Sequence, residues 1–582
     1  MKIEGYYIGV DVGTGSARAC LVGSSLILAQ HEIEIPREEL MPDHITQSST
    51  FIWEAICTCI KEVISKASIC AENIRAIGFD ATCSLVMIDK NDNSPLAVGP
   101  DPNNDDQNII LWMDHRATKE TDIINSIGDK CLKYVGGKMS VEMELPKIKW
   151  LKGFRSIKDA KFFDLPDYLT FKATGKETRS FCSTVCKQGL LPSGVAGSVD
   201  GWSREFLNSI DLDELNENNF ESLGGSITKK GSFLSAGQPV GYLSKTAAKE
   251  MGLSESTLVA SGIIDAYAGY IGTVAAKPTS GHIIDSKMTE RLAMVAGTST
   301  CHIIVSDHEL MVPGVWGPYK NVLFSDYWAA EGGQSCTGAL LQHILTTHPS
   351  YNELIGLTKG KQNPFDYLNS ILCSKLEKLS LNSISDLTRD LFVYGDYHGN
   401  RSPLSDPDMR ATVIGQTLDT SIESLALLYL ASCEFIALQT KHIIDTMVKA
   451  GHNIKTIYMS GSQVNNELLV ELMVKATDLD IIIPEHKAIN LSSTTSSSVA
   501  YGSAILGMCA YETYHCKEKS TSKEILWHVM NEVTPSGKLY SAKEITNKYE
   551  QDLLNVKYEI YLDMIKTQKR YRDMIKKFNN KK

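Results

Sequence analysis

Two glycine-threonine turns, almost three hundred residues apart, are the segments of this 582-residue sequence best suited to hold phosphate. The first lies within residues 8–22 and the second within residues 293–305. Each stands between two apolar, β-prone runs, so each predicts a tight hairpin. Such turns present backbone N–H groups and hydroxyls to an anion, and their glycines let a phosphate come close. A single hairpin of this kind is best explained as a structural turn, but the pair indicates a duplicated fold that holds a nucleotide's phosphates between its copies.

Two other phosphate-binding motifs do not fit the sequence. The first turn begins like a dinucleotide-binding loop at Gly13 and Gly15, but Arg18 replaces the last glycine and a strand-like run follows where that motif requires a helix. Residues 356–362 have the wrong spacing for a Walker A loop and lack Ser or Thr after the lysine.

Two carboxylates stand at the ends of predicted strands, where phosphoryl transfer could use them. Asp11 ends the first strand beside the turn and could hold Mg²⁺, largely through water, or it could only stabilise the turn. Asp265 ends the apolar run 258–264 and precedes a helix of small residues. It could be a helix N-cap, or a general base that the helix N-terminus keeps ionised and that takes the proton from an attacking sugar hydroxyl.

Two further side chains have the chemistry to bind a polyol. Glu331 precedes two glycines at an expected strand-to-helix turn, and a carboxylate accepts hydrogen bonds from adjacent hydroxyls. The alternative for Glu331 is a solvated turn carboxylate. Lys187 could donate to a carbonyl or hydroxyl oxygen, although an isolated lysine is more often a surface residue.

Composition indicates a globular protein with two large domains, because 43% of the residues are hydrophobic, 22% are charged and the chain exceeds the size of one core. The net charge of −11 argues against a nucleic-acid partner. Fourteen cysteines without zinc spacing indicate reduced thiols.

We expect no signal peptide, because Asp11 and Arg18 interrupt the apolar N-terminus, and no membrane span, because the apolar segment 425–438 is too short. The expected location is the cytoplasm.

The elements that must position these residues can be read from periodicity and turn signals. We expect a helix over 52–65, strands over 74–79 and 109–113, and a loop-rich region from 135 to about 240. In the second half we expect a helix over 421–449 with a capping box at Thr420 and Glu423, a β-α-β unit over 454–483, a serine-rich turn at 492–498 and a small-residue helix over 499–509. The basic end of the chain is expected to be a solvated helix face, with contact to an anionic partner as the alternative.

Nine motifs together resemble the FGGY family of carbohydrate kinases over nearly the whole chain. They occupy residues 9–18, 78–85, 112–116, 147–151, 265–269, 296–299, 331–335, 395–403 and 460–465. The resemblance implies an α/β fold of two ribonuclease H-like (actin/hexokinase-like) domains that face a central cleft. It places an N-terminal domain at 1–283, a C-terminal domain at 284–510 and a helical C-terminal extension at 511–582.

The same resemblance implies the residues that do the chemistry. Asp265 would be the catalytic base, and Asp11 would hold Mg²⁺. The pentulose site would consist of Cys83, Lys187, Asp265 and Glu331. ATP would be bound by Gly13, Thr14, Gly15, Ser16 and Arg18 in the first loop, by Gly297, Thr298 and Ser299 in the second, and by Gly461, Ser462 and Asn465 in the adenosine loop. The adenosine loop departs from the family pattern at Ser460, Val464 and Asn466, and Tyr267 replaces a common His.

The implied activity is ATP-dependent phosphorylation of a pentulose. Residues 80–84, 312–319 and 398–403 are most similar to a eukaryotic subgroup that phosphorylates D-ribulose, which makes D-ribulose 5-phosphate the expected product. The alternatives are another ketopentose or a pentitol as acceptor, or a catalytically weak nucleotide-binding regulatory protein on the same scaffold. The expected partners are the pentulose and ATP, and a homodimer remains open.

Overall fold

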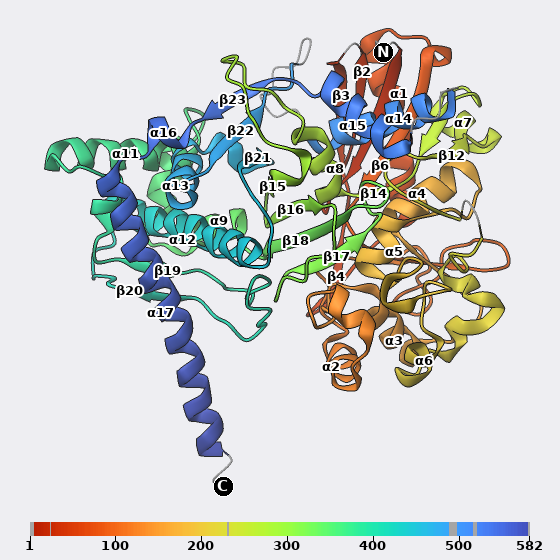
Figure 1. The fold of residues 1–582 in the computed structure, drawn as a ribbon, viewed down its shortest axis with the longest axis horizontal. Coiled ribbons are helices and arrows are strands. Elements are labelled where there is room, and N and C mark those ends of the chain that lie inside the picture. The colour runs from red at the N-terminus through yellow and green to blue at the C-terminus, as the bar shows by residue number, and fades with distance from the viewer. Residues whose placement is uncertain (1–4, 24, 230–231, 488–497, 516–520, 580–582) are drawn as a thin grey trace.

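The two halves of the chain contain the same arrangement of strands. The computed structural model describes residues 5–23, 25–229, 232–487, 498–515 and 521–579. The first sheet has the order β12-β13-β6-β1-β2-β3, with β14 beside β6, and the second has the order β17-β18-β16-β15-β21-β22-β23 (Figure 1). In both, three antiparallel strands are followed by two parallel ones: β3-β2-β1 then β6 and β13, and β18-β16-β15 then β21 and β22. The predicted α/β fold of two like halves is confirmed.

The strand bounds are as follows. The first sheet consists of β1 (Tyr6–Val12), β2 (Ser16–Gly23), β3 (Leu26–Glu34), β6 (Ile74–Ala81), β12 (Pro239–Tyr242), β13 (Leu258–Ala260) and β14 (Ile263–Ile264). The second sheet consists of β15 (Arg291–Ala296), β16 (Thr300–Ser306), β17 (Trp316–Lys320), β18 (Trp328–Gln334), β21 (Thr456–Ser460), β22 (Asp480–Pro484) and β23 (Gly537–Tyr540). Both glycine-threonine hairpins are therefore present, as β1–β2 and β15–β16.

Several predicted helices are also confirmed. The helix expected over 52–65 is α1 (Ser49–Ala67), whose N-cap Ser48 accepts a hydrogen bond from the Phe51 N–H. The β-α-β unit is β21, α13 (Glu467–Thr477) and β22, and the two strands are parallel. The helix after Asp265 is α8 (Asp265–Thr273).

The region expected to be loop-rich instead contains several helices and one strand of a further sheet. It includes α3 (Glu144–Phe154), β9 (Ala160–Asp164), α4 (Leu165–Thr174) and α5 (Phe181–Lys187). Strand β9 completes a five-stranded sheet with β4 (Glu38–Met41), β5 (His44–Gln47), β7 (Leu85–Asp89) and β8 (Ile109–Ile110). The strand expected over 109–113 ends at Ile110. These elements are short, so tertiary packing decides them and a periodicity argument misses them.

Helix α14 (Ser498–His515) crosses from the second half to the first. It contacts α8, β6 and β1, and Figure 1 shows it beside the elements of the first half. The approach is close enough to require glycine, because a Cβ at Gly9 would lie 1.8 Å from the Ala500 carbonyl oxygen and one at Gly502 would lie 2.0 Å from that of Ala268. Through these contacts α14 fixes the helix that begins with Asp265. Of the predicted serine-rich turn, residues 492–497 lie outside the described residues.

Helix α12 (Ile422–Lys449) is the one helix in the described ranges that is long and apolar enough to cross a membrane. The argument that its apolar segment is too short was therefore wrong, since the helix has 28 residues. Its apolar window is 72% buried, however, against α13, α9 (Gly338–Thr347) and α11 (Pro364–Leu379), as in the core helix of a globular domain. The predicted capping box is also wrong, because the N-cap is Ser421, which accepts from the Ser424 N–H.

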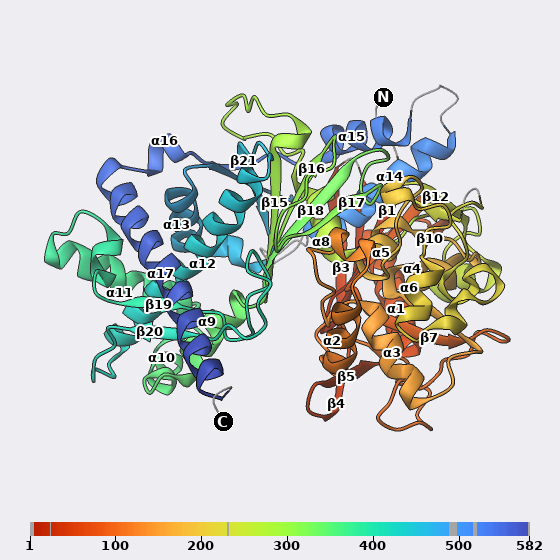
Figure 2. The same ribbon diagram turned by 60° about the horizontal axis from the view of Figure 1, so that its bottom comes forward.

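The segment after residue 511 is not wholly helical. Besides the end of α14, it contains α15 (Ser522–Val533), the strand β23 and α17 (Lys548–Asn579). Strand β23 pairs antiparallel with β22 and extends the second sheet. Helix α17 contacts α12 and α13 and runs along the second half (Figure 2). Strand β23 and helix α17 are therefore part of the second half, whereas α15 packs on α14.

Candidate active site between the two halves

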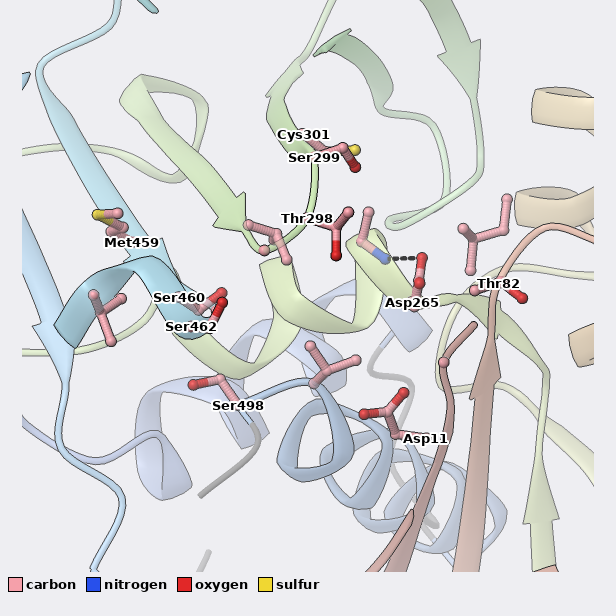
Figure 3. A pocket seen from close by; sticks show the side chains of 18 of the residues that line it. Asp11, Thr82, Asp265, Thr298, Ser299, Cys301, Met459, Ser460, Ser462 and Ser498 are labelled. Atoms are coloured by element: carbon pink, nitrogen blue, oxygen red, sulfur yellow. Dashed lines mark hydrogen bonds between the residues drawn. The ribbon is translucent and has the colours of Figure 1, made fainter. Parts of the chain in front are cut away.

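A cavity of about 1120 Å³ lies between the two halves and collects nearly every residue that the sequence singles out. The predicted site residues that line it are Asp11, Gly13, Thr14, Arg18, Cys83, Lys187, Asp265, Gly297, Thr298, Ser299, Glu331, Gly461, Ser462 and Asn465. Figure 3 shows Asp11, Asp265 and Thr298 around the same space, with Ser460 and Ser462 farther toward the second half. Gly15 and Ser16 do not line the cavity.

The first phosphate turn is held in place from the neighbouring sheet. The Gly13 N–H donates to the Ser16 carbonyl at 2.9 Å, which closes the turn. The Trp112 indole N–H donates to the Thr14 hydroxyl at 3.0 Å, and the Gln47 amide donates to the Thr14 carbonyl at 2.9 Å. Because Trp112 also lines the cavity, the turn and the cavity wall are physically connected.

The second glycine-threonine turn is packed directly against the 460–465 loop, which is expected to hold adenosine. The Gln463 amide donates to the Gly297 carbonyl at 2.6 Å and to the Thr337 hydroxyl at 2.7 Å. Gly461 has a φ of 91°, and a Cβ there would lie 2.2 Å from the Ala296 carbonyl oxygen. Only glycine fits this position, so the two segments form one rigid surface.

Asp11 is buried at the cavity beside the first glycine-threonine turn, where its carboxylate could hold a metal ion. Its carboxylate is 3% exposed, lies 3.2 Å from a guanidinium nitrogen of Arg18 and faces the cavity. Behind it lies Asp80. Burial, followed by the Asp11 charge, raises the pKa of Asp80 well above the usual range. No cluster of three or more potential ligand side chains occurs among the described residues. One carboxylate beside a phosphate turn nevertheless suits Mg²⁺, which keeps several waters and takes other ligands from the substrate's phosphates.

Asp265 is the first residue of α8, and Ile264 occupies the N-cap position. Its Oδ1 accepts a hydrogen bond from the Ala266 N–H at 2.7 Å, which Figure 3 marks. Burial, followed by the negative charge of Asp11, raises the pKa of Asp265 to about 7. The Ala266 N–H at the helix N-terminus does favour the ionised form, but burial and a like charge outweigh this local effect.

The polyol-binding candidates form a cluster near the cavity wall. Glu331 lies in the middle of β18, not at a strand-to-helix turn as expected. Its Oε2 accepts a hydrogen bond from the Tyr267 hydroxyl at 3.1 Å and lies 4.0 Å from the Lys187 Nζ. The Lys187 side chain is 2% exposed, so the surface-lysine alternative is also wrong. Burial opposes the charge of Lys187, but Cys83 and Glu331 beside it raise its pKa well above the usual range. Tyr267, a departure from the family pattern, thus holds Glu331 in place.

Several cavity residues were not predicted from the sequence as site residues. They are Thr82, Trp112, Glu142, Cys301, Trp316, Arg401, Lys538 and Tyr540. Trp112 and Arg401 lie in motifs noted above, but nothing in those motifs says which side chain faces the cavity. Lys538 and Tyr540 belong to β23, in a segment that the sequence indicated to be helical. Glu142 carries no sequence signal, since it stands in the region expected to be loop-rich.

Comparison with solved structures shows the same two-domain fold. A xylulose kinase from Rhodospirillum rubrum has a TM-score of 0.71 with 14% identity, covering 97% of this chain and 99% of that chain. Glycerol kinase from Plasmodium falciparum with ADP has a TM-score of 0.70 with 15% identity, covering 96% of this chain and 98% of that chain.

Comparison of sequences reveals closer relatives. D-ribulokinase YDR109C of Saccharomyces cerevisiae is 47% identical, with 98% of this chain and 94% of that protein covered. The human FGGY carbohydrate kinase domain-containing protein is 38% identical, with 98% of both covered. Residues 6–272 match the N-terminal domain of the FGGY family of carbohydrate kinases, and residues 292–511 match its C-terminal domain. The chain therefore belongs to the FGGY family of carbohydrate kinases.

Proposed function

We propose that this ATP-dependent carbohydrate kinase transfers the γ-phosphate of ATP to the terminal hydroxyl of D-ribulose. The observation that carries the proposal is the cavity that Asp265, Cys83, Lys187 and Glu331 line together with the two glycine-threonine turns. The yeast relative that is 47% identical to this chain is named D-ribulokinase, and this name supports D-ribulose as the acceptor.

In the proposed reaction Asp265 is the general base. The terminal hydroxyl of the sugar donates its hydrogen bond to the Asp265 carboxylate and loses that proton as its oxygen attacks the γ-phosphorus. A new oxygen–phosphorus bond forms while the bond from the γ-phosphorus to the bridging oxygen of ADP breaks. A base with a pKa of about 7 suits this task, because about half of it is ionised at neutral pH and it is still basic enough to accept a proton.

The remaining residues hold the two substrates in line. Lys187 and Cys83 would donate to sugar oxygens, and Glu331 would accept from sugar hydroxyls. The turns at Gly13–Thr14 and Gly297–Ser299 would bind the phosphates from opposite domains, and the loop at Gly461–Asn465 would hold adenosine. When bound, Mg²⁺ would neutralise charge on the phosphates, with Asp11 as its principal protein ligand.

The protonation of Asp265 predicts a distinct pH profile. Below its pKa the carboxyl is neutral and cannot act as a base, so kcat/KM for D-ribulose should rise with pH, pass its midpoint near pH 7 and level off above it. Initial rates between pH 5.5 and 9 in buffers of constant ionic strength would show this. A profile that is flat from pH 5.5 to 8 would contradict the assignment of Asp265 as the base.

The acceptor itself can be identified with a sugar panel. ADP formation is followed with D-ribulose, L-ribulose, D-xylulose, L-xylulose and ribitol, each against a control without sugar. We expect D-ribulose to give the largest kcat/KM, by about tenfold or more over each of the others, because a misplaced or missing hydrogen-bonding group leaves buried polar side chains unpaired. A larger value for a pentitol or another ketopentose would replace D-ribulose as the acceptor. ATP binding without turnover on any sugar would support a regulatory role instead.

A further inference from the structure

An ion pair joins the two domains at one end of the cavity. Glu142 belongs to the first domain, just before α3, and Arg401 belongs to the second, between β19 (Phe392–Tyr394) and β20 (Thr412–Ile414). The Arg401 Nη2 lies 2.9 Å from Oε2 and 3.2 Å from Oε1 of Glu142. Both residues line the cavity, and their side chains are 7% and 12% exposed. Removing two charges from water costs free energy unless the charges stabilise each other or bind a ligand.

The guanidinium of Arg401 is held by its surroundings in one position. It stacks on Trp316, with its central carbon 4.9 Å from the ring centroid, and lies 6.0 Å from that of Trp112. Its Cδ packs on Gly333, where an added Cβ would lie only 2.4 Å away. A glycine at position 333 is therefore needed for Arg401 to reach this place, and the charge it presents to the cavity is preorganised.

The contacts place Arg401 at the far end of the acceptor site from Asp265. Asp265 and Tyr267 both belong to the first turn of α8, and the Tyr267 hydroxyl donates to Glu331 at 3.1 Å, so Glu331 lies near the base. The Cys301 sulfur is 3.7 Å from Oε1 of Glu331 and 3.8 Å from Nη1 of Arg401, so it lies between them. These contacts therefore lead from α8 through Glu331, which lies 4.0 Å from Lys187, and Cys301 to Arg401 and its partner Glu142.

Arg401 has hydrogen-bonding capacity that the protein does not use. A guanidinium carries five N–H donors. Among the described residues, Nη1 of Arg401 donates to the Cys301 thiol, which is only a weak acceptor. The guanidinium donates and cannot accept, so it matches an oxygen that only accepts, such as a ketose carbonyl. At the far end of a ketopentose attacked at its terminal hydroxyl stand the C2 carbonyl and the C1 hydroxyl.

We propose that Arg401, oriented by Glu142, binds the C1–C2 end of the acceptor and thereby selects for the length and the keto group of the sugar. This inference rests on the proposed function, because it assigns the part of the same substrate that is remote from Asp265. It also explains why the two domains meet through charged groups here: a sugar that reaches Arg401 contacts both domains at once.

The test compares acceptors of two lengths. Variants R401Q, R401K and E142Q are assayed with D-ribulose and with the four-carbon ketose D-erythrulose, whose keto end is one carbon nearer to the attacked hydroxyl. The matched control is R410Q, because Arg410 lies on the same loop but is exposed and does not line the cavity. KM for each sugar, KM for ATP, kcat and the melting temperature are measured for every variant.

We expect R401Q to raise KM for D-ribulose by about 10- to 100-fold, the usual range for losing a hydrogen bond from a charged group. KM for ATP and for D-erythrulose should stay within about threefold, so the preference for D-ribulose should collapse. R401K and E142Q should shift KM for D-ribulose in the same direction by a smaller factor, and R410Q should match wild type.

Other results overturn the role of Arg401. An unchanged KM for D-ribulose in R401Q, or equal losses with both ketoses, would contradict it, and if R401Q does not fold, the same criteria apply to R401K and E142Q. A wild-type enzyme that does not phosphorylate D-ribulose overturns the proposed function as well. If the wild-type enzyme phosphorylates D-ribulose and the variants have the same KM for D-ribulose as wild type, only the role of Arg401 is overturned.

Discussion

Replacing Asp265 by Asn should lower kcat for D-ribulose phosphorylation by about 10³-fold or more while both substrates still bind. The amide keeps the size of the side chain but cannot accept the proton of the attacking hydroxyl, and general-base catalysis contributes about 10² to 10⁴ in rate. The loss should appear in kcat and in kcat/KM alike, since the proton is transferred only in the transition state. Single-turnover measurements with saturating ATP and D-ribulose would give the rate of the chemical step.

The control for this variant is Asp285→Asn, because Asp285 is exposed and does not line the cavity. Titration calorimetry with a non-hydrolysable ATP analogue and D-ribulose should give dissociation constants within a few-fold of wild type for both variants. Activity of Asp265→Asn within tenfold of wild type would show that another group takes the proton.

The same substitution should stabilise the free protein at neutral pH. The folded-state pKa of about 7 is higher than the usual value of an aspartate, so the folded protein holds this proton more tightly than the unfolded chain does. The resulting stability is present below pH 4 and is lost as pH rises to about 7. A neutral Asn avoids that loss, so a higher melting temperature together with lost activity would mark a residue kept for function.

Replacing Lys557 by Met should lower the free energy of unfolding by about 3 to 5 kcal/mol, because it leaves a buried carboxylate without its partner. The Lys557 Nζ on α17 lies 2.7 Å from Oε2 and 2.8 Å from Oε1 of Glu434 on α12, and the two side chains are 3% and 4% exposed. The same ammonium donates to the Thr388 hydroxyl at 2.7 Å. The pair therefore fastens the C-terminal helix to the core of the second domain.

Urea unfolding followed by tryptophan fluorescence would measure this loss. Lys566→Met, an exposed lysine on the same helix, is the matched control and should change the midpoint little. The double variant Glu434→Gln with Lys557→Met should recover part of the loss, because the uncompensated charge is gone. A loss below 1 kcal/mol for Lys557→Met would mean that water or another cation reaches Glu434 in the folded protein.

Local sequence patterns predicted the parts of the site that single hairpins and strand ends define. Gly13, Thr14, Gly297 and Thr298 stand where a small-residue turn between two apolar runs must place them, and Asp11 stands at a strand end beside its turn. These features depend on neighbours a few residues away, so the sequence alone contains the information.

Local sequence patterns could not predict the features that depend on long-range packing. Glu331 lies within a strand because its backbone pairs with β16 and β17, although two glycines follow it and a turn seemed the simpler interpretation. The pKa of Asp265 is raised first by burial and then by Asp11, which comes from a distant part of the chain, so the local helix N-terminus alone does not set it. Arg401 and Glu142 meet only when the two domains face each other.

The C-terminal segment shows the same limit. Its polar, charged composition predicted a solvated helical extension, and α17 does carry many charges. Strand β23 is too short for an alternation pattern, yet it completes the second sheet and brings Lys538 and Tyr540 to the cavity. The buried Glu434 of the apolar α12 likewise has its partner, Lys557, on the distant helix α17.

The position of the phosphate in the product tests the central claim most directly. The account predicts that ATP and D-ribulose yield ADP and a sugar phosphate whose phosphorus couples to the protons on C5 in a ³¹P–¹H correlation spectrum, identifying D-ribulose 5-phosphate. A phosphate on any other carbon, or release of inorganic phosphate without a sugar ester, would contradict transfer from the two phosphate turns to a terminal hydroxyl held at Asp265.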